Sequence, residues 1–225
     1  MQEELKKMIN HFKVINEEQA KNKKIIMRVD FNVPMQSGKI LDDTRIKSVV
    51  PGLKILADCA KQIFLLTHLG RPNGIFRPEL SVQPLQDYLS RELPYDVSFI
   101  PHVDNLSKLI EKADKEEKIC LLDNCRFYPG EEKNDLDLAK SYASIADIYV
   151  NDAFSCCHRS HSSIQSITRF LPSYAGPVLA AEIKALTNSL ENPLRPLAAF
   201  VGGAKISTKL SILENLISKV DKLLL

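Results

Sequence analysis

The sequence lacks three features that would each point to a particular class of protein. No apolar run approaches the roughly 18 residues needed to cross a bilayer, and the charged N-terminal segment does not resemble a secretory signal. The net charge is only +2, which excludes binding to nucleic acid through bulk positive charge. The 5 cysteines are odd in number and scattered, which favours a reducing compartment over a disulfide scaffold. We therefore expect a cytoplasmic protein with no membrane or nucleic-acid partner.

What is present is the composition of an ordinary globular chain, with 44% hydrophobic and 26% charged residues. Apolar runs typical of β-strands alternate with segments of helical periodicity. The runs cover residues 25–34, 62–69, 96–103, 118–125 and 147–154, and the helical segments cover 44–60, 81–93, 105–117 and 135–146, with candidate N-caps at Asp43 or Thr44, Ser81, Asn105 and Asp135. This alternation predicts an α/β fold with a doubly wound parallel sheet covered on both faces, in a Rossmann-like three-layer arrangement.

The pattern changes after Asp152. A polar loop at 155–163 leads to a long helical segment at 178–193, which ends at a proline-containing stretch. An apolar run, a helical segment and the start of another strand then follow, over 197–203, 207–220 and 222–225. We predict an α/β domain over residues 1–175, a bridging helix and hinge over 176–196, and the first β-α unit of a second, incomplete α/β domain over 197–225.

Three polar residues interrupt the first apolar run. Arg28, Asp30 and Asn32 are spaced by two, so on a continuous strand they would share one face. Burying such groups without hydrogen-bond partners is unfavourable. Two interpretations stay open: the three side chains satisfy one another, or they line a cleft at the end of the strand.

Arginines follow the predicted strands at similar positions. Four arginines lie in a loop or at a helix start that follows a predicted strand. They are Arg45, Arg71, Arg126 and Arg159. Because the carboxyl ends of parallel strands meet at one edge of the sheet, the four are expected to converge. Converging cations repel one another unless an anion neutralises them, and guanidinium groups bind carboxylate and phosphate bidentately. The pattern therefore predicts a small, multiply anionic ligand.

Three further side chains are candidates for this site. His68 lies in the turn that contains Arg71, and we expect it to contact the ligand directly. His161 lies near Arg159, and we expect it to act as a neutral hydrogen-bond donor behind the contact layer. Asp30 is the carboxylate that we place in the cleft, where it would accept a hydrogen bond from a substrate hydroxyl.

These segments carry a resemblance to a known family. RVDFNVP, DDTRI, THLGRP, LDNCRF, VNDAF followed by HRSHSS, and VGGAKISTKL are similar, in order and interval, to phosphoglycerate kinases from about residue 23 onward. The resemblance implies two doubly wound α/β domains, the first binding 3-phosphoglycerate and the second binding Mg-ATP or Mg-ADP as substrate, without a tightly bound cofactor or a protein metal site. It implies a monomeric glycolytic enzyme that transfers a phosphoryl group reversibly between 1,3-bisphosphoglycerate and ADP, giving 3-phosphoglycerate and ATP.

The resemblance also implies roles for individual residues. Arg45 and Lys205 would be catalytic, and Gly203, Lys205 and Lys209 would bind the nucleotide. Substrate contacts would come from Asp30, Phe31, Asn32, Arg45, His68, Leu69, Gly70, Arg71, Arg126 and Arg159. The sequence departs from the family pattern in two places: Asp123 stands where the family usually has Glu, and Ser155, Cys156 and Cys157 stand where small, non-thiol residues are commoner.

Other interpretations of the sequence stay open. A metal or nucleic-acid module would draw on Cys156, Cys157, His158 and His161, with Cys120 and Cys125 as a second pair, although their spacing matches no usual zinc pattern. A second alternative is a catalytically incompetent fragment that only binds 3-phosphoglycerate. Finally, Cys125 or the Cys156–Cys157 pair could be activated by the nearby arginines, or could be inert, small apolar side chains.

Overall fold

The computed structural model describes residues 12–36, 38–102, 117–191, 193–202 and 210–225. The chain forms two compact units, Met1–Ala180 and Ala181–Leu225. Among the described residues, no helix combines the length and the apolar character that crossing a membrane requires.

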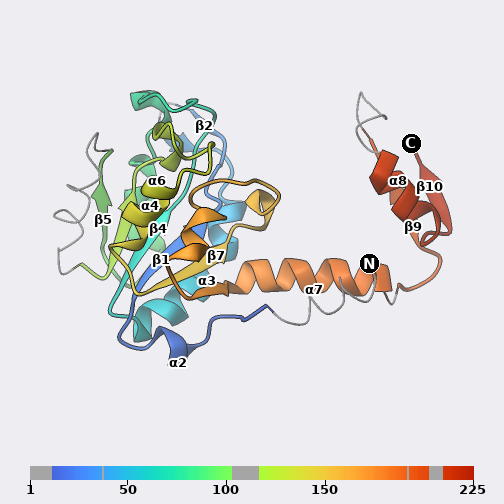
Figure 1. Cartoon of the computed structure of the whole chain (residues 1–225), viewed down its shortest axis with the longest axis horizontal. Helices are drawn as coiled ribbons and strands as arrows, with labels where there is room; N and C mark the ends of the chain where they lie inside the picture. Colours follow the sequence, from blue (N-terminus) through green and yellow to red (C-terminus); the bar gives the residue numbers. More distant parts are fainter. Residues whose placement is uncertain (1–11, 37, 103–116, 192, 203–209) are drawn as a thin grey trace. The chain divides into compact units, whose positions relative to one another are not determined.

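The first unit is built on a six-stranded sheet in which all neighbouring strands are parallel (Figure 1). The strand order is β5-β6-β4-β1-β7-β8. The strands are β1 (Lys24–Val29), β4 (Gln62–Leu66), β5 (Val97–Ile100), β6 (Ile119–Leu122), β7 (Ile148–Asp152) and β8 (Ser173–Ala175). The connection from β6 to β7 carries the chain to the other side of β1, so the winding reverses beside β1. Open α/β sheets bind ligands outside the carboxyl ends of strands at such a reversal.

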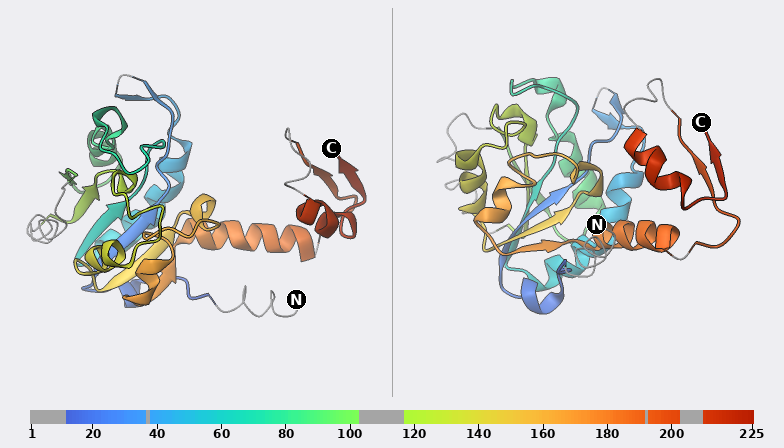
Figure 2. Two further views of the ribbon diagram at one scale, coloured as in Figure 1. Left: turned by 45° about the horizontal axis from the view of Figure 1, so that its top comes forward. Right: turned by 45° about the vertical axis from the view of Figure 1, so that its right-hand side comes forward.

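Helices cover both faces of this sheet (Figure 2). On one face, α3 (Thr44–Cys59) and α4 (Pro84–Glu92) pack into an apolar cluster that contains Ile25 and Met27 of β1. On the other face, α6 (Leu136–Ala143) packs into a cluster that contains Ile26. Successive residues of a strand point to opposite faces, so β1 contributes to both clusters. The predicted doubly wound, three-layer α/β fold is confirmed.

The first strand is shorter than the sequence predicts. β1 ends at Val29, and Asp30 and Asn32 lie in the connection that follows it. At this point the Phe31 amide donates to the side-chain oxygen of Thr67, at 3.0 Å, instead of to a strand neighbour. The expectation that Arg28, Asp30 and Asn32 share one strand face is therefore wrong, because only Arg28 belongs to the strand.

The helix starts agree with the sequence in part. Asp135 caps α6, since its side chain accepts the Leu138 amide at 2.8 Å. Asp43 precedes α3, but its side chain makes no capping hydrogen bond. The second predicted helix begins later than expected, at Pro84, and the Ser81 hydroxyl accepts the Gln83 amide at 3.2 Å in the turn before it. The predicted helix over 105–117, with its cap at Asn105, lies almost entirely outside the described residues.

Several short elements have no counterpart in the prediction. They are α2 (Glu17–Ala20), the antiparallel pair β2 (Met35–Gln36) and β3 (Lys39–Ile40), strand β8, and the 3-10 turns Pro78–Leu80, Cys125–Phe127, Phe154–Cys156 and Ser166–Arg169. Strand β8 is bordered by the segment before α2. The Ile15 amide donates to the Ala175 carbonyl at 2.9 Å, and the Ala175 amide donates to the Lys13 carbonyl at 2.8 Å.

Helix α7 (Pro177–Glu191) begins in the first unit and continues into the second. The rest of the second unit contains β9 (Ala198–Phe200), α8 (Leu210–Ile217) and β10 (Lys222–Leu224), and β9 and β10 form a parallel pair. Asp221, just before β10, is bonded to the segment just before β9. Its carboxylate pairs with Arg195 at 2.6 Å and accepts the Leu197 amide at 2.7 Å. The domain limits 1–175, 176–196 and 197–225 stay predictions.

Candidate functional site

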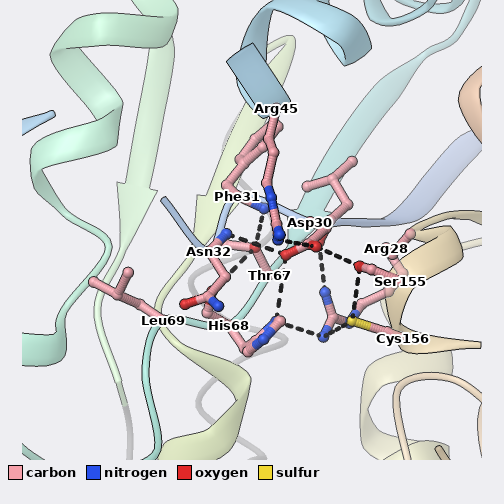
Figure 3. Close-up of polar contacts among 12 residues, drawn as sticks. Arg28, Asp30, Phe31, Asn32, Arg45, Thr67, His68, Leu69, Ser155 and Cys156 are labelled. Atoms are coloured by element: carbon pink, nitrogen blue, oxygen red, sulfur yellow. Dashed lines mark hydrogen bonds and ion pairs between the residues drawn. The ribbon is translucent and has the colours of Figure 1, made fainter. Parts of the chain in front are cut away.

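Polar side chains gather where β1, β4 and β7 end. Figure 3 shows Asp30, Arg45, His68 and Ser155 directed toward one another around the end of β1. They come from the loop after β1, the first turn of α3, the loop after β4 and the turn after β7. The site therefore lies at the carboxyl edge of the sheet, beside the reversal in winding.

Asp30 accepts three hydrogen bonds. One carboxylate oxygen accepts from Arg45 Nη1 at 2.5 Å and from the Ser155 hydroxyl, and the other accepts from the Asn32 amide at 3.2 Å. The side chain of Asp30 is 12% exposed, whereas that of Arg45 is 52% exposed. The carboxylate is thus held in place from the protein side, while the guanidinium of Arg45 remains open to solvent.

Gly70 connects two of the predicted site residues through its backbone. Its amide donates to Asn32 Oδ1 at 2.9 Å, and its carbonyl accepts from Arg126 Nη1 at 2.8 Å. The φ of Gly70 is +61°, in the left-handed region that favours glycine, and a Cβ at this position would lie 3.0 Å from the Leu80 side chain. Glycine at this turn therefore fixes the positions of Asn32 and Arg126 together.

Two predicted contact residues direct their side chains into the protein. Phe31 belongs to the apolar cluster beneath α3, and Leu69 belongs to the same cluster. The carbonyl of Leu69 accepts from Asn124 Nδ2 at 2.7 Å. A ligand at this edge would meet these two residues through their backbones.

Asp123 holds the segment that precedes α4. Its side chain accepts the Ser81 hydroxyl at 2.9 Å and the Val82 amide at 3.0 Å. The neighbouring Asn124 Nδ2 donates to the Leu69 carbonyl at 2.7 Å and to the Leu80 carbonyl at 3.0 Å. Asp123, which stands where the family usually has Glu, is thus hydrogen-bonded to the neighbouring loop.

His68 is buried and neutral. Its Nδ1 lies 3.1 Å from Arg28 Nη2 and 3.9 Å from Asp30 Oδ1. Burial lowers the pKa of His68 to about 2, and the positive charges of Arg28, Arg126 and Arg159 add to the effect. Burial and the same kind of neighbours lower the pKa of His161 to about 4. Both imidazoles are therefore uncharged at neutral pH.

The predicted arginines differ in their surroundings. Arg126 is buried and lies 3.4 Å from Glu132, and Arg159 is half-buried. The positive charges of both contribute to the lowered pKa of His68. Arg45 is held by Asp30, and Arg71 is exposed. The place of Arg71 in an anion site stays a prediction.

Two buried charged residues of this region were not among the predicted site residues, although the sequence had marked Arg28 as part of a polar cluster or a cleft. Arg28 is fully buried, and its Nε donates to Ser163 Oγ at 3.0 Å. Glu131 is also fully buried, accepts from the Ser163 hydroxyl and amide, and has its pKa raised by burial, against the opposing effect of Arg28. A positively charged residue within an apolar strand was the feature of the sequence that could have indicated a role for Arg28. Glu131 gave no signal, since it stands in a charged loop.

One group of side chains in the described part of the chain has the geometry of a metal site. Asp30, His68 and Cys156 offer ligand atoms that all lie within 4.8 Å of one another. Arg28 Nη2, however, lies 3.1 Å from His68 Nδ1 and 3.9 Å from Cys156 Sγ. The permanently charged guanidinium of Arg28 already contacts two of these three groups, so the group does not fit a divalent cation. The zinc set considered from the sequence contributes only Cys156 to it.

The five cysteines are all free thiols. Cys125 is fully buried, and burial raises the pKa of its thiol well above the usual range despite the nearby arginines. Cys157 is exposed, yet partial desolvation of its sulfur raises its thiol pKa as well. The raised pKa values of Cys125 and Cys157 argue against their activation by arginines, because desolvation of the thiolate outweighs the charge effect.

The predicted nucleotide contacts Gly203, Lys205 and Lys209 lie outside the described residues. The catalytic role of Lys205 stays a prediction for the same reason.

Comparison with known proteins gives one consistent result. A family model described as phosphoglycerate kinase matches residues 15–225. The phosphoglycerate kinase of Methylorubrum extorquens is 47% identical over 204 residues, which cover 90% of this chain and 51% of the relative. That of Fervidobacterium nodosum is 44% identical over 213 residues, covering 94% of this chain and 53% of the relative.

Solved structures agree with the sequence relatives. The structure of phosphoglycerate kinase from Coxiella burnetii has a TM-score of 0.78 at 40% identity, over 91% of this chain and 51% of that structure. The Pyrococcus horikoshii structure has a TM-score of 0.78 at 29% identity. The chain spans about half the length of the curated relatives it matches.

Proposed function

The chain belongs to the phosphoglycerate kinase family, and from this membership we propose that it carries the 3-phosphoglycerate site of such a kinase. The reaction is reversible phosphoryl transfer between 1,3-bisphosphoglycerate and ADP, giving 3-phosphoglycerate and ATP. Mg-ADP and Mg-ATP are substrates, and their phosphates are assigned to Gly203, Lys205 and Lys209. The proposal includes a monomeric, cytoplasmic enzyme without membrane or nucleic-acid partners.

The observation that supports the substrate assignment is the charge pattern around His68. Arg28, Arg126 and Arg159 all lie close enough to lower the pKa of this buried, neutral imidazole. A cluster of guanidinium groups around an uncharged donor suits a ligand that carries a phosphate and a carboxylate. The carboxylate of Asp30 supplies an acceptor for the hydroxyl group of the same ligand. 3-Phosphoglycerate has all three functional groups.

The roles of the chain's residues follow from the needs of phosphoryl transfer. The reaction depends on positioning and on stabilisation of charge, and the attacking carboxylate is already ionised, so no general base is required. Arg45 is held by Asp30 through Nη1 and about half of its side chain is exposed, so we assign its guanidinium to a migrating phosphoryl group. Arg126, fixed by the Gly70 carbonyl, is assigned to ground-state binding.

Isothermal titration calorimetry with 3-phosphoglycerate tests this proposal. Arg126→Ala should weaken binding about tenfold or more, since it removes a buried charged donor. Arg91→Ala, an exposed arginine over the Tyr88 ring, is the control and should leave binding unchanged. Binding should also weaken as salt rises. No 3-phosphoglycerate binding, or equal binding by both variants, would refute the assignment, and an assay of ATP formation from 1,3-bisphosphoglycerate and ADP tests the transfer step.

A further inference from the structure

A single serine hydroxyl links two fully buried, oppositely charged side chains. Ser163 Oγ donates to Glu131 Oε1 at 2.5 Å and accepts from Arg28 Nε at 3.0 Å. A hydroxyl has one hydrogen to donate and lone pairs to accept, so both hydrogen bonds can form at once. The Ser163 amide also donates to Glu131 Oε2, at 3.1 Å. Glu131 is thus the counter-charge of Arg28, and it acts through Ser163.

Arg28 is oriented by its other hydrogen bonds. Nη1 donates to the carbonyl of Val29, and Nη2 lies 3.1 Å from His68 Nδ1. A guanidinium has only hydrogens to offer, because it is permanently charged and has no acceptor. The ring nitrogen that faces it must therefore present a lone pair. Nδ1 of His68 is the acceptor, and the hydrogen of the neutral ring is carried by Nε2.

We propose that Glu131, Ser163 and Arg28 form a buried relay that fixes His68 as the Nε2-protonated tautomer, so that the imidazole donates a hydrogen bond to an anionic group of the substrate. This inference rests on the proposed function for the identity of the substrate alone. Glu131, Ser163 and Arg28 are positioning residues, since they act on the ligand through His68.

Other groups near the relay do not replace its members. His161 Nδ1 lies 3.8 Å from Glu131 Oε1, beyond hydrogen-bond distance. Asp30 Oδ1 lies 3.9 Å from His68 Nδ1, farther than Arg28 Nη2. The close contact to His68 Nδ1 is therefore made by a donor, and the nearby carboxylate does not draw a proton to that nitrogen.

Nuclear magnetic resonance of the whole chain, labelled with nitrogen-15 at histidine, tests the relay without substrate. At neutral pH, His68 should show a protonated Nε2 and an unprotonated Nδ1. Ser163→Ala cuts the link between Arg28 and Glu131, so it should produce a mixture of the two tautomers and weaken 3-phosphoglycerate binding about tenfold. Glu131→Gln keeps the shape, removes the charge and should act in the same direction.

Ser162→Ala is the matched control. Ser162 is as buried as Ser163, but its hydroxyl lies 2.9 Å from each of the carbonyl oxygens of Gly130 and Asp135, and its one hydrogen is shared between these two acceptors. This variant should keep the wild-type His68 spectrum. A protonated Nδ1 in the wild type, or the same His68 spectrum in Ser163→Ala as in wild type, would overturn the relay. The expected tautomer in a chain that binds no 3-phosphoglycerate would support the relay and refute the proposed function.

Discussion

The carboxylate of Asp152, at the end of β7, lies against the backbone of Gly176, just before α7. A Cβ at residue 176 would lie 2.4 Å from Asp152 Cγ, a separation that real atoms do not reach. Asp152 Oδ1 also accepts the Leu179 amide at 2.9 Å, in the first turn of α7. One buried side chain thus joins the end of a central strand to the start of the long helix.

Gly176→Ala should therefore destabilise the first unit. The added methyl group would push Asp152 away from the amide of Leu179, and overpacking of this kind costs roughly 1–3 kcal/mol. Chemical denaturation followed by circular dichroism measures the change. Gly202→Ala is the control, because a Cβ there meets nothing within 4 Å. Equal stability of the two variants would show that the start of α7 adjusts freely.

Asp152→Asn should change how stability depends on pH. Burial raises the pKa of Asp152 from its ordinary 3.8 to about 6. Between these two values the folded state binds the proton more tightly than the unfolded state, so ionisation of Asp152 lowers stability as the pH rises through this window. Asparagine cannot ionise but can still accept the Leu179 amide. The variant should gain up to roughly 3 kcal/mol relative to wild type above pH 6, and this gain should vanish near pH 4.

Denaturation curves of Asp152→Asn and wild type from pH 4 to pH 8 provide the comparison. Asp137→Asn, which removes an exposed carboxylate of the same kind, serves as the control. A stability difference for Asp152→Asn that does not change with pH would contradict the raised pKa.

Ser155→Ala should strengthen the binding of 3-phosphoglycerate. The Ser155 hydroxyl donates to the same oxygen of Asp30 that pairs with Arg45, so a ligand hydroxyl has to compete with it. Its removal should tighten binding by about three- to tenfold, the scale of one hydrogen bond to a charged acceptor. Calorimetry would measure this, with Ser173→Ala as control, since that hydroxyl donates to the Leu171 carbonyl. Weaker binding would instead mean that Ser155 contacts the ligand.

The cysteines should differ in alkylation by exposure and not by activation. Cys157 should react with iodoacetamide more slowly than a free thiol, because desolvation raises its pKa. Cys125, which is fully buried, should react only after the chain unfolds. Mass spectrometry of peptides after timed labelling, with and without denaturant, distinguishes the two. Rapid labelling of Cys125 in the native protein would contradict its burial.

The sequence was sufficient to predict the central sheet, and the reason is visible in β4. All five residues of this strand are buried, because a parallel strand with helices on both faces is apolar throughout. Strand β8 could not be predicted in the same way. It has three residues, and what makes it a strand is pairing with β7 and with the segment at Val14.

In the candidate site, too, some residues could be predicted from the sequence and others could not. Loop arginines stand out in the sequence because they recur after each strand, and the charges of Arg126 and Arg159 both help to lower the pKa of His68. The buried partners of Arg28 were not predictable, since Ser163 lies 135 residues further along the chain. A contact of that range depends on the order of strands, which local periodicity does not determine.

The short segment before α2 has a consequence for self-association. Strand β8 lies at one border of the sheet, and a free strand border can pair with another molecule. Here the amide of Ala175 donates to the Lys13 carbonyl, and the carbonyl of Ala175 accepts the Ile15 amide. These residues shield that border with backbone from the same chain, which disfavours intermolecular strand pairing and aggregation along β8.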